Sequence, residues 1–127
     1  MANDVAHDEL VEASIACKDL EVAELIKSLV QKDNFEVDMI TKDVSSVELC
    51  GALKNVVALA AGFCDGLNVG SSTKAAIIRK GMQEMVLFCT NFSGESFNVE
   101  TILSSCGIAD VIATCFGGRN RKCAEEF

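Results

Sequence analysis

The first 45 residues alternate between strand-like and helix-like patterns of apolar positions. Residues 12–16 (EASIA) form a short run that predicts a strand, and residues 20–30 (LEVAELIKSLV) place apolar side chains at helical spacing. Residues 35–41 (FEVDMIT) alternate apolar and polar positions, as a half-buried strand does. The order strand, helix, strand predicts a β-α-β piece of an α/β layer, and two strands are too few to form a stable sheet alone.

After about residue 45 the pattern becomes helical. Ser45 and Glu48 fit a capping box that opens a long helix ending near Gly66, and apolar residues all round this helix indicate close packing against neighbours. The later predicted elements are, in order, a helix at about 73–88, a loop at 91–98, helices at about 99–105 and 108–116 divided by Gly107, and a helix beginning near Arg119.

The composition of the chain limits the kinds of molecule that it is expected to bind. Half of the 127 residues are hydrophobic and 24% are charged, which is typical of a soluble globular domain. The net charge of -8 argues against a nucleic-acid partner, although local basic groups remain able to bind a small anion. No stretch is expected to reach the roughly 18–20 apolar residues of a membrane span. The acidic N-terminus lacks the build of a signal peptide, so we expect an intracellular protein without a membrane partner.

The seven cysteines do not form a metal-binding pattern. They contain no C-x-x-C pair, and the only histidine is His7. Their odd number, their places inside apolar runs and the lack of a secretory signal predict reduced thiols and no metal site.

Lys54 is the first candidate for chemistry, because it is the only charged residue between Glu48 and Asp65. An ammonium among Val, Leu and Ala side chains loses hydration, which disfavours its charged form and lowers its pKa. Lysines in that state donate and accept protons near neutral pH. The alternative is a lysine whose stem covers apolar surface while its head reaches water. Asn55 follows Lys54 directly.

Asp110 and Thr114 form a second candidate cluster in an otherwise apolar segment, GIADVIATC. They are four residues apart and therefore share one face of a helix. A buried carboxylate needs a partner, and a buried lysine elsewhere in the chain is the obvious one. In the alternative interpretation Asp110 caps a helix near a kink at Gly107, and Thr114 bonds the preceding turn.

The run Gly117-Gly118-Arg119-Asn120 is the third candidate. Two glycines let backbone amides approach a ligand, and the first turn of a helix leaves those amides free for an anion. Arg119 adds a planar donor fork suited to a phosphate, and Asn120 adds a further donor. The alternative is a solvated basic turn after a helix end.

Long segments of the chain resemble the NAD-dependent glycerol-3-phosphate dehydrogenase family, in its eukaryotic cytosolic form. The resemblance is carried by GALKNVVALAAGFCDGLNVG (51–70), TKAAIIRKGMQEM (73–85) and CGIADVIATCFGGRNRKCAEEF (106–127). It implies NAD(H)-dependent interconversion of dihydroxyacetone phosphate and sn-glycerol 3-phosphate in the cytoplasm, by a homodimer.

The resemblance also implies roles for single residues. Lys54 is similar to the catalytic lysine, which protonates the forming alkoxide at C2 and acts as base in the reverse direction. The other implied site residues are Asn55, Asp110 and Thr114 around that lysine, Arg119 and Asn120 on the substrate phosphate, and Ala2 and Arg119 beside NAD.

The fold implied by the resemblance has two parts. Residues 1–45 resemble the end of a Rossmann-type NAD-binding domain. Residues 46–127 resemble the first part of an all-helical substrate domain of the 6-phosphogluconate-dehydrogenase-like kind.

Three features of the family are missing from this sequence, namely the glycine-rich dinucleotide loop, a second lysine near the substrate, and the final C-terminal helices with their cofactor contacts. We therefore expect a central fragment of a dehydrogenase that is inactive alone. The alternatives are a truncated, non-catalytic module that mediates interaction or dimerisation, and a related dehydrogenase with a different phosphorylated substrate.

Overall fold

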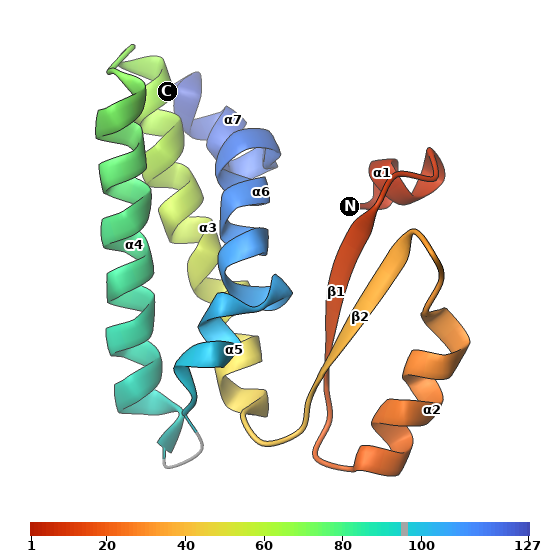
Figure 1. Ribbon diagram of the computed structural model, residues 1–127. Helices are drawn as coiled ribbons and strands as arrows, with labels where there is room; N and C mark the ends of the chain where they lie inside the picture. Colours follow the sequence, from red (N-terminus) through yellow and green to blue (C-terminus); the bar gives the residue numbers. More distant parts are fainter. Residues whose placement is uncertain (95–96) are drawn as a thin grey trace.

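The computed structural model describes residues 1–94 and 97–127, which form a β-α-β unit and a helical bundle side by side (Figure 1). A short helix, α1 (Ala2–Ala6), precedes strand β1 (Val11–Ala16), helix α2 (Leu20–Val30) and strand β2 (Phe35–Ile40). The two strands pair in parallel, with Val11 opposite Phe35 and Ala16 opposite Ile40. The predicted strand–helix–strand order is confirmed, and the bounds of α2 are those that its periodicity predicts.

The helical part contains two long antiparallel helices and several short ones. In chain order they are α3 (Val44–Gly66), α4 (Ser71–Phe92), α5 (Val99–Leu103), the π-helical turn η2 (Ser105–Ala109), α6 (Asp110–Gly117) and α7 (Arg119–Glu125). Helix α3 lies between α4 and α6, and α7 crosses its C-terminal end (Figure 1). The chain is therefore mostly helical, with a small two-stranded parallel sheet.

The core lies where α3 meets α4, α5 and α6. Its fully or nearly fully buried side chains come from all of these neighbours: Cys50, Val57, Ala58, Ala61, Met85, Cys89, Ile102, Val111 and Cys115. Small residues on α3 allow close approach, since a Cβ built on Gly62 would lie 2.2 Å from the carbonyl oxygen of Arg121 in α7. The abundance of Ala, Gly and Cys in α3 thus serves its packing on several sides.

The capping box predicted at Ser45 and Glu48 is wrong. Asp43 is the N-cap of α3, and its Oδ1 accepts a hydrogen bond from the amide of Ser46 at 3.3 Å. The second carboxylate oxygen accepts from the amide of Asn98 at 2.9 Å, which ties the start of α3 to the start of α5. Asp43 is the favoured cap because its carboxylate accepts hydrogen bonds from backbone amides at the starts of two helices, α3 and α5.

Two predicted boundaries in the later part also change. Helix α4 continues to Phe92, so the predicted loop at 91–98 begins too early, and residues 95–96 of that loop lie outside the described part of the chain. Gly107 does not divide two helices; it lies within η2, which runs into α6. A Cβ on Gly107 would lie 2.0 Å from the carbonyl oxygen of Ile102, so this backbone approach requires glycine.

Helix α3 also corrects the expectation that no segment reaches the length of a membrane span. Its 23 residues, with a mean hydropathy of 1.5 in the most apolar window, meet that criterion by length and composition alone. The core helix of a soluble protein meets the same criterion. In this structure α3 is the central helix of the bundle.

Candidate active site

Lys54 and Asp110 form an ion pair between α3 and α6. The Nζ atom of Lys54 donates to Oδ2 of Asp110 at 2.5 Å, and the two side chains keep 23% and 32% of their surface exposed. The predicted partnership of the lysine and the carboxylate is therefore confirmed, while the ammonium itself is half-buried rather than enclosed. An ammonium that is held by a carboxylate and still reaches solvent is able to meet a small substrate.

Thr114 lies one turn further along α6. Its hydroxyl bonds the preceding turn of the helix and also lies beside the Asp110 carboxylate, so both interpretations of its role apply. Its hydroxyl donates to the backbone carbonyl of Asp110 at 2.6 Å, as a threonine within a helix commonly does. The same hydroxyl lies 3.5 Å from Oδ1 of Asp110, the carboxylate oxygen that Lys54 does not occupy. Asp110 itself caps no backbone amide with its side chain, so its partner is the lysine and not a helix end.

Asn55 and Asn120 extend the cluster toward α7. The amide nitrogen of Asn120 donates to the side-chain oxygen of Asn55 at 2.9 Å. Arg119 precedes Asn120, is exposed, and forms no ion pair with any residue that the structure describes. The structure thus brings five of the predicted residues onto adjacent turns of α3, α6 and α7, with Arg119 beside them.

Gly118 sets the distance between α6 and α7. It ends α6 and begins α7 with φ −68° and ψ 151°, which any residue can adopt. Glycine is required at this position for steric reasons, because a Cβ there would lie 2.4 Å from the carbonyl oxygen of Thr114. The glycine run that the sequence offered as an anion site therefore also has a packing role.

Ala2 is the predicted residue that lies apart from the others. It is exposed and begins α1, at the end of the β-α-β unit rather than in the helical bundle (Figure 1). Hydrogen bonds from η2 to both strands link the two parts. Ser105 pairs with Ser14 of β1 at 2.7 Å, the amide of Cys106 donates to Ser14 at 3.2 Å, and Ser105 donates to Asp38 of β2 at 3.4 Å.

A cluster of charges that the sequence did not reveal lies at the other end of α3. Asp65 accepts from Lys74 of α4 at 2.7 Å and from Arg121 of α7 at 2.6 Å. Arg121 also pairs with Glu125 at 2.8 Å, so it faces inward rather than toward solvent as Arg119 does. The one local signal for this cluster was that Lys74 follows Asp65 by nine residues, across the turn between α3 and α4, so the two opposite charges could meet.

This cluster predicts a pH dependence of stability. Hydrogen bonds from Lys74 and Arg121 lower the pKa of Asp65 below its ordinary value of 3.8. A carboxyl whose pKa is lower in the folded chain stabilises it above the unfolded value and loses that contribution as pH falls through the folded value. We therefore expect Asp65→Asn to lower the unfolding temperature at pH 7, and the deficit to shrink as pH falls below 3.8.

The matched control for that experiment is Glu84→Gln, which neutralises an exposed carboxylate on α4. Thermal unfolding followed by circular dichroism between pH 3 and pH 7 measures both variants. A deficit of Asp65→Asn that stays constant over this range, or a Glu84→Gln variant with the same deficit, would contradict the assignment.

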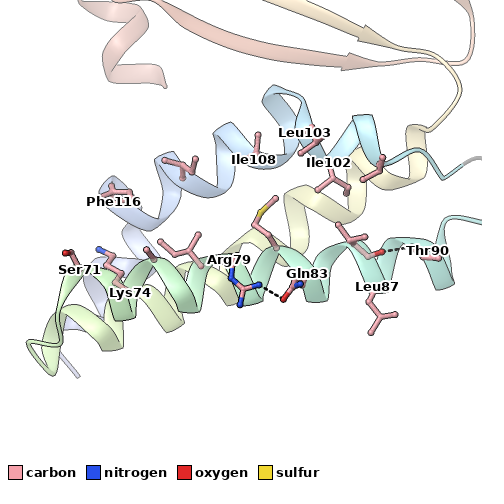
Figure 2. A pocket seen from close by; sticks show the side chains of 16 residues that line it. Ser71, Lys74, Arg79, Gln83, Leu87, Thr90, Ile102, Leu103, Ile108 and Phe116 are labelled. Carbon is pink, nitrogen blue, oxygen red and sulfur yellow. Dashed lines mark hydrogen bonds between the residues drawn. The ribbon is translucent and has the colours of Figure 1, made fainter.

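A large hollow among the described residues is separate from the Lys54–Asp110 pair. It is an apolar groove of about 880 Å³ between α4 on one side and α5, η2 and α6 on the other (Figure 2). Ile78, Met82, Ile102, Ile108 and Phe116 contribute to its lining, and Arg79 donates to Gln83 at 2.8 Å at its edge (Figure 2). Lys54 and Asp110 do not line it, so the candidate site is defined by the paired side chains and not by this groove.

Solved structures share this fold over nearly the whole chain. The structure of DsGPDH from Dunaliella salina matches with a TM-score of 0.92 and 45% identity, over 99% of this chain and 21% of that one. Glycerol-3-phosphate dehydrogenase from Plasmodium falciparum matches with a TM-score of 0.91 and 42% identity, over 100% of this chain and 35% of that one. A parallel β-α-β unit joined to this helical bundle is therefore the class of fold that both solved structures contain.

Sequence comparison gives the particular family. The family model described as NAD-dependent glycerol-3-phosphate dehydrogenase C-terminus matches residues 43–127, so the chain belongs to that family. Cytoplasmic glycerol-3-phosphate dehydrogenase [NAD(+)] of Rattus norvegicus is 50% identical over 127 residues, which are all of this chain and 36% of the rat protein. The chain thus spans about a third of the length of the curated relatives that it matches.

Proposed function

We propose that these residues supply the proton-transfer and phosphate-binding part of a glycerol-3-phosphate dehydrogenase. The reaction is the NAD(H)-dependent interconversion of dihydroxyacetone phosphate and sn-glycerol 3-phosphate, and the matched rat protein is a glycerol-3-phosphate dehydrogenase [NAD(+)]. The observation that carries the proposal is the ion pair of Lys54 and Asp110, next to the linked amides of Asn55 and Asn120.

The proton step belongs to Lys54. Reduction at C2 of dihydroxyacetone phosphate places negative charge on the former carbonyl oxygen, and the Nζ atom of Lys54 donates a proton to it. In the reverse direction the neutral amine takes the hydroxyl proton. Asp110 holds the ammonium in place at 2.5 Å, and Thr114 lies at the other oxygen of that carboxylate. Asp110 and Thr114 thereby position the lysine without exchanging the proton themselves.

Arg119 and Asn120 bind the phosphate in this proposal. The exposed guanidinium of Arg119 offers a charged, bidentate donor that no described carboxylate occupies. Asn120 is held on Asn55, which follows Lys54 directly, so the phosphate donors and the proton donor are linked through one hydrogen bond.

The cofactor of the proposed reaction is NAD, which gives or accepts the hydride at C2 when it is bound. The donor set of this chain fits a dinucleotide phosphate or amide edge, since Arg119 is cationic, exposed and unpaired within the described chain. Arg119 and the backbone of Ala2 are the residues that we assign to cofactor contacts. We further assign residues 1–45 to the end of a Rossmann-type NAD-binding domain and residues 46–127 to the helical substrate domain.

The wider setting follows the relatives that the chain matches. The rat and mouse relatives are cytoplasmic enzymes by name, and we propose the same location for this protein. We also propose that the complete enzyme is a homodimer, because exposed large apolar side chains such as Leu87, Phe92 and Leu103 offer surface for a further interface.

Charge reversal at Arg119 tests the phosphate assignment. The experiment uses a full-length hybrid in which this chain replaces the matching segment of the rat relative, whose alignment covers all 127 residues. We expect Arg119→Glu to raise KM for dihydroxyacetone phosphate by about a hundredfold, because loss of a charged donor costs roughly 3 kcal/mol.

The control is Lys122→Glu, which reverses an exposed charge on the same helix. Steady-state rates of NADH oxidation are measured for the hybrid and for both variants. Unchanged KM in Arg119→Glu, or an equal rise in Lys122→Glu, would refute the assignment of the phosphate to Arg119.

A further inference from the structure

The charge cluster of Asp65, Lys74 and Arg121 joins the C-terminal end of α3 to α4 and α7. The Oδ2 atom of Asp65 accepts from Nζ of Lys74 at 2.7 Å and from Nη1 of Arg121 at 2.6 Å. The side chains of Asp65, Lys74 and Arg121 keep only 21%, 12% and 14% of their surface exposed. Asp65 lies in the last turn of α3, where the helix dipole disfavours a carboxylate, so the two cations stabilise it there.

The two cations of the charge cluster contact both sides of the turn that carries Arg119. The Nζ atom of Lys74 lies 4.6 Å from the ring centroid of Phe116, near the end of α6 (Figure 2). Arg121 lies in the first turn of α7, two residues after Arg119. Only two glycines separate Phe116 from Arg119. Asp65 is therefore linked, through one cation on each side, to the chain just before and just after Arg119.

Helix α7 depends on such contacts for its orientation. It has seven residues, and a helix of this length has little stability of its own. Among the described residues, Arg121 forms its one ion pair outside α7 with Asp65, and its Nε atom is buried without a hydrogen-bond partner. The ion pair of Arg121 with Glu125 lies within α7 and does not fix the helix on its neighbours. The contact with Asp65 is thus the restraint that Arg121 supplies between α7 and α3.

We propose that Asp65 and Lys74 are positioning residues for phosphate binding, which hold Arg119 and Asn120 in place for the substrate phosphate. The inference rests on the proposed function, because that function assigns the phosphate to these two donors. Asp65 follows Lys54 by 11 residues on α3, which is roughly 16 Å along the helix axis at 1.5 Å per residue. The charge cluster therefore acts on substrate binding and not on proton transfer.

The test is Asp65→Asn in the full-length hybrid, with KM and kcat for dihydroxyacetone phosphate measured at saturating NADH. The amide keeps the size of the carboxylate but removes the negative charge that both cations contact. We expect KM to rise about tenfold, less than for Arg119→Glu, because the phosphate donors are displaced and not removed. Inorganic phosphate is the binding probe, and its inhibition constant against the substrate should rise by the same factor. The value of kcat should stay within about twofold.

The split between KM and kcat separates positioning from stability. Unfolding of part of the enzyme lowers the measured kcat but leaves the KM of the folded remainder unchanged. Lys74→Met is the second variant, because it removes the contact with Phe116 but leaves the Asp65–Arg121 ion pair in place. We expect it to raise KM in the same direction, and it decides the question if Asp65→Asn does not fold. Glu84→Gln, on the exposed surface of α4, is the control and should change neither constant.

A folded Asp65→Asn hybrid with unchanged KM and unchanged inhibition by phosphate would overturn the proposal. If Arg119→Glu still raises KM in that case, the phosphate assignment stands and the charge cluster serves stability alone. Unchanged KM in both variants would refute the proposed function of Arg119 together with the positioning role.

Discussion

Replacing Lys54 by methionine in the full-length hybrid enzyme is expected to lower kcat by about 10²–10⁴-fold, the range attributed to general acid catalysis. The methionine keeps an unbranched apolar stem of similar length on α3 but removes the proton that the ammonium delivers. The loss should fall on kcat more than on KM for dihydroxyacetone phosphate, because the substrate phosphate is assigned to Arg119 and Asn120. Steady-state kinetics of NADH oxidation separates the two constants.

The same substitution leaves the Asp110 carboxylate without its partner, so stability must be measured beside activity. Asp110 keeps 32% of its side chain exposed, and water can hydrate the freed oxygen, so we expect the hybrid to remain folded. Lys80→Met, on the exposed surface of α4, is the matched control and should leave kcat unchanged. A Lys54→Met hybrid that is folded and retains its kcat would exclude Lys54 as the proton donor.

Short-range patterns predicted the β-α-β unit well, because its signals lie within each element. The spacing of apolar residues in 20–30 gave a helix with the observed bounds, and alternation in 35–41 gave β2 to within a residue. The N-cap of α3 was missed for the opposite reason. Ser45 with Glu48 and Asp43 with Ser46 are both plausible locally, and the amide of Asn98, 55 residues away, favours Asp43.

The candidate site shows the same difference between signals that lie within one element and contacts between residues far apart in the chain. A lone lysine in an apolar helix and a lone aspartate in another indicated a pair, and the structure places them in contact. Asp65 gave no comparable signal because it lies in the last turn of α3, where a charged side chain usually faces solvent. Its partner Arg121 comes from α7, 56 residues later, and only the crossing of α7 over α3 brings them together.

That crossing of α7 over α3 depends on Gly62, where replacement by alanine would have two opposing effects on stability. Alanine is favoured over glycine within a helix by up to about 1 kcal/mol. At position 62, however, the added Cβ would lie 2.2 Å from the carbonyl oxygen of Arg121 and 2.7 Å from the Cβ of Ala124. Overpacking of this kind costs about 1–3 kcal/mol, and a backbone oxygen cannot turn aside as a flexible side chain can. We therefore expect Gly62→Ala to destabilise the chain.

Gly51→Ala, in the same helix, is the matched control because nothing lies within 4 Å of the Cβ it would add. It should raise the free energy of unfolding by up to about 1 kcal/mol, since only the helix preference acts there. Chemical denaturation of the two variants gives opposite signs if α7 packs on α3 at Gly62. The clash also displaces α7, which carries Arg119 and Asn120, so in the hybrid Gly62→Ala should raise KM for dihydroxyacetone phosphate while Gly51→Ala should not. Two variants that stabilise equally would show that α7 does not pack there, and the link between Asn120 and Asn55 would lose its support.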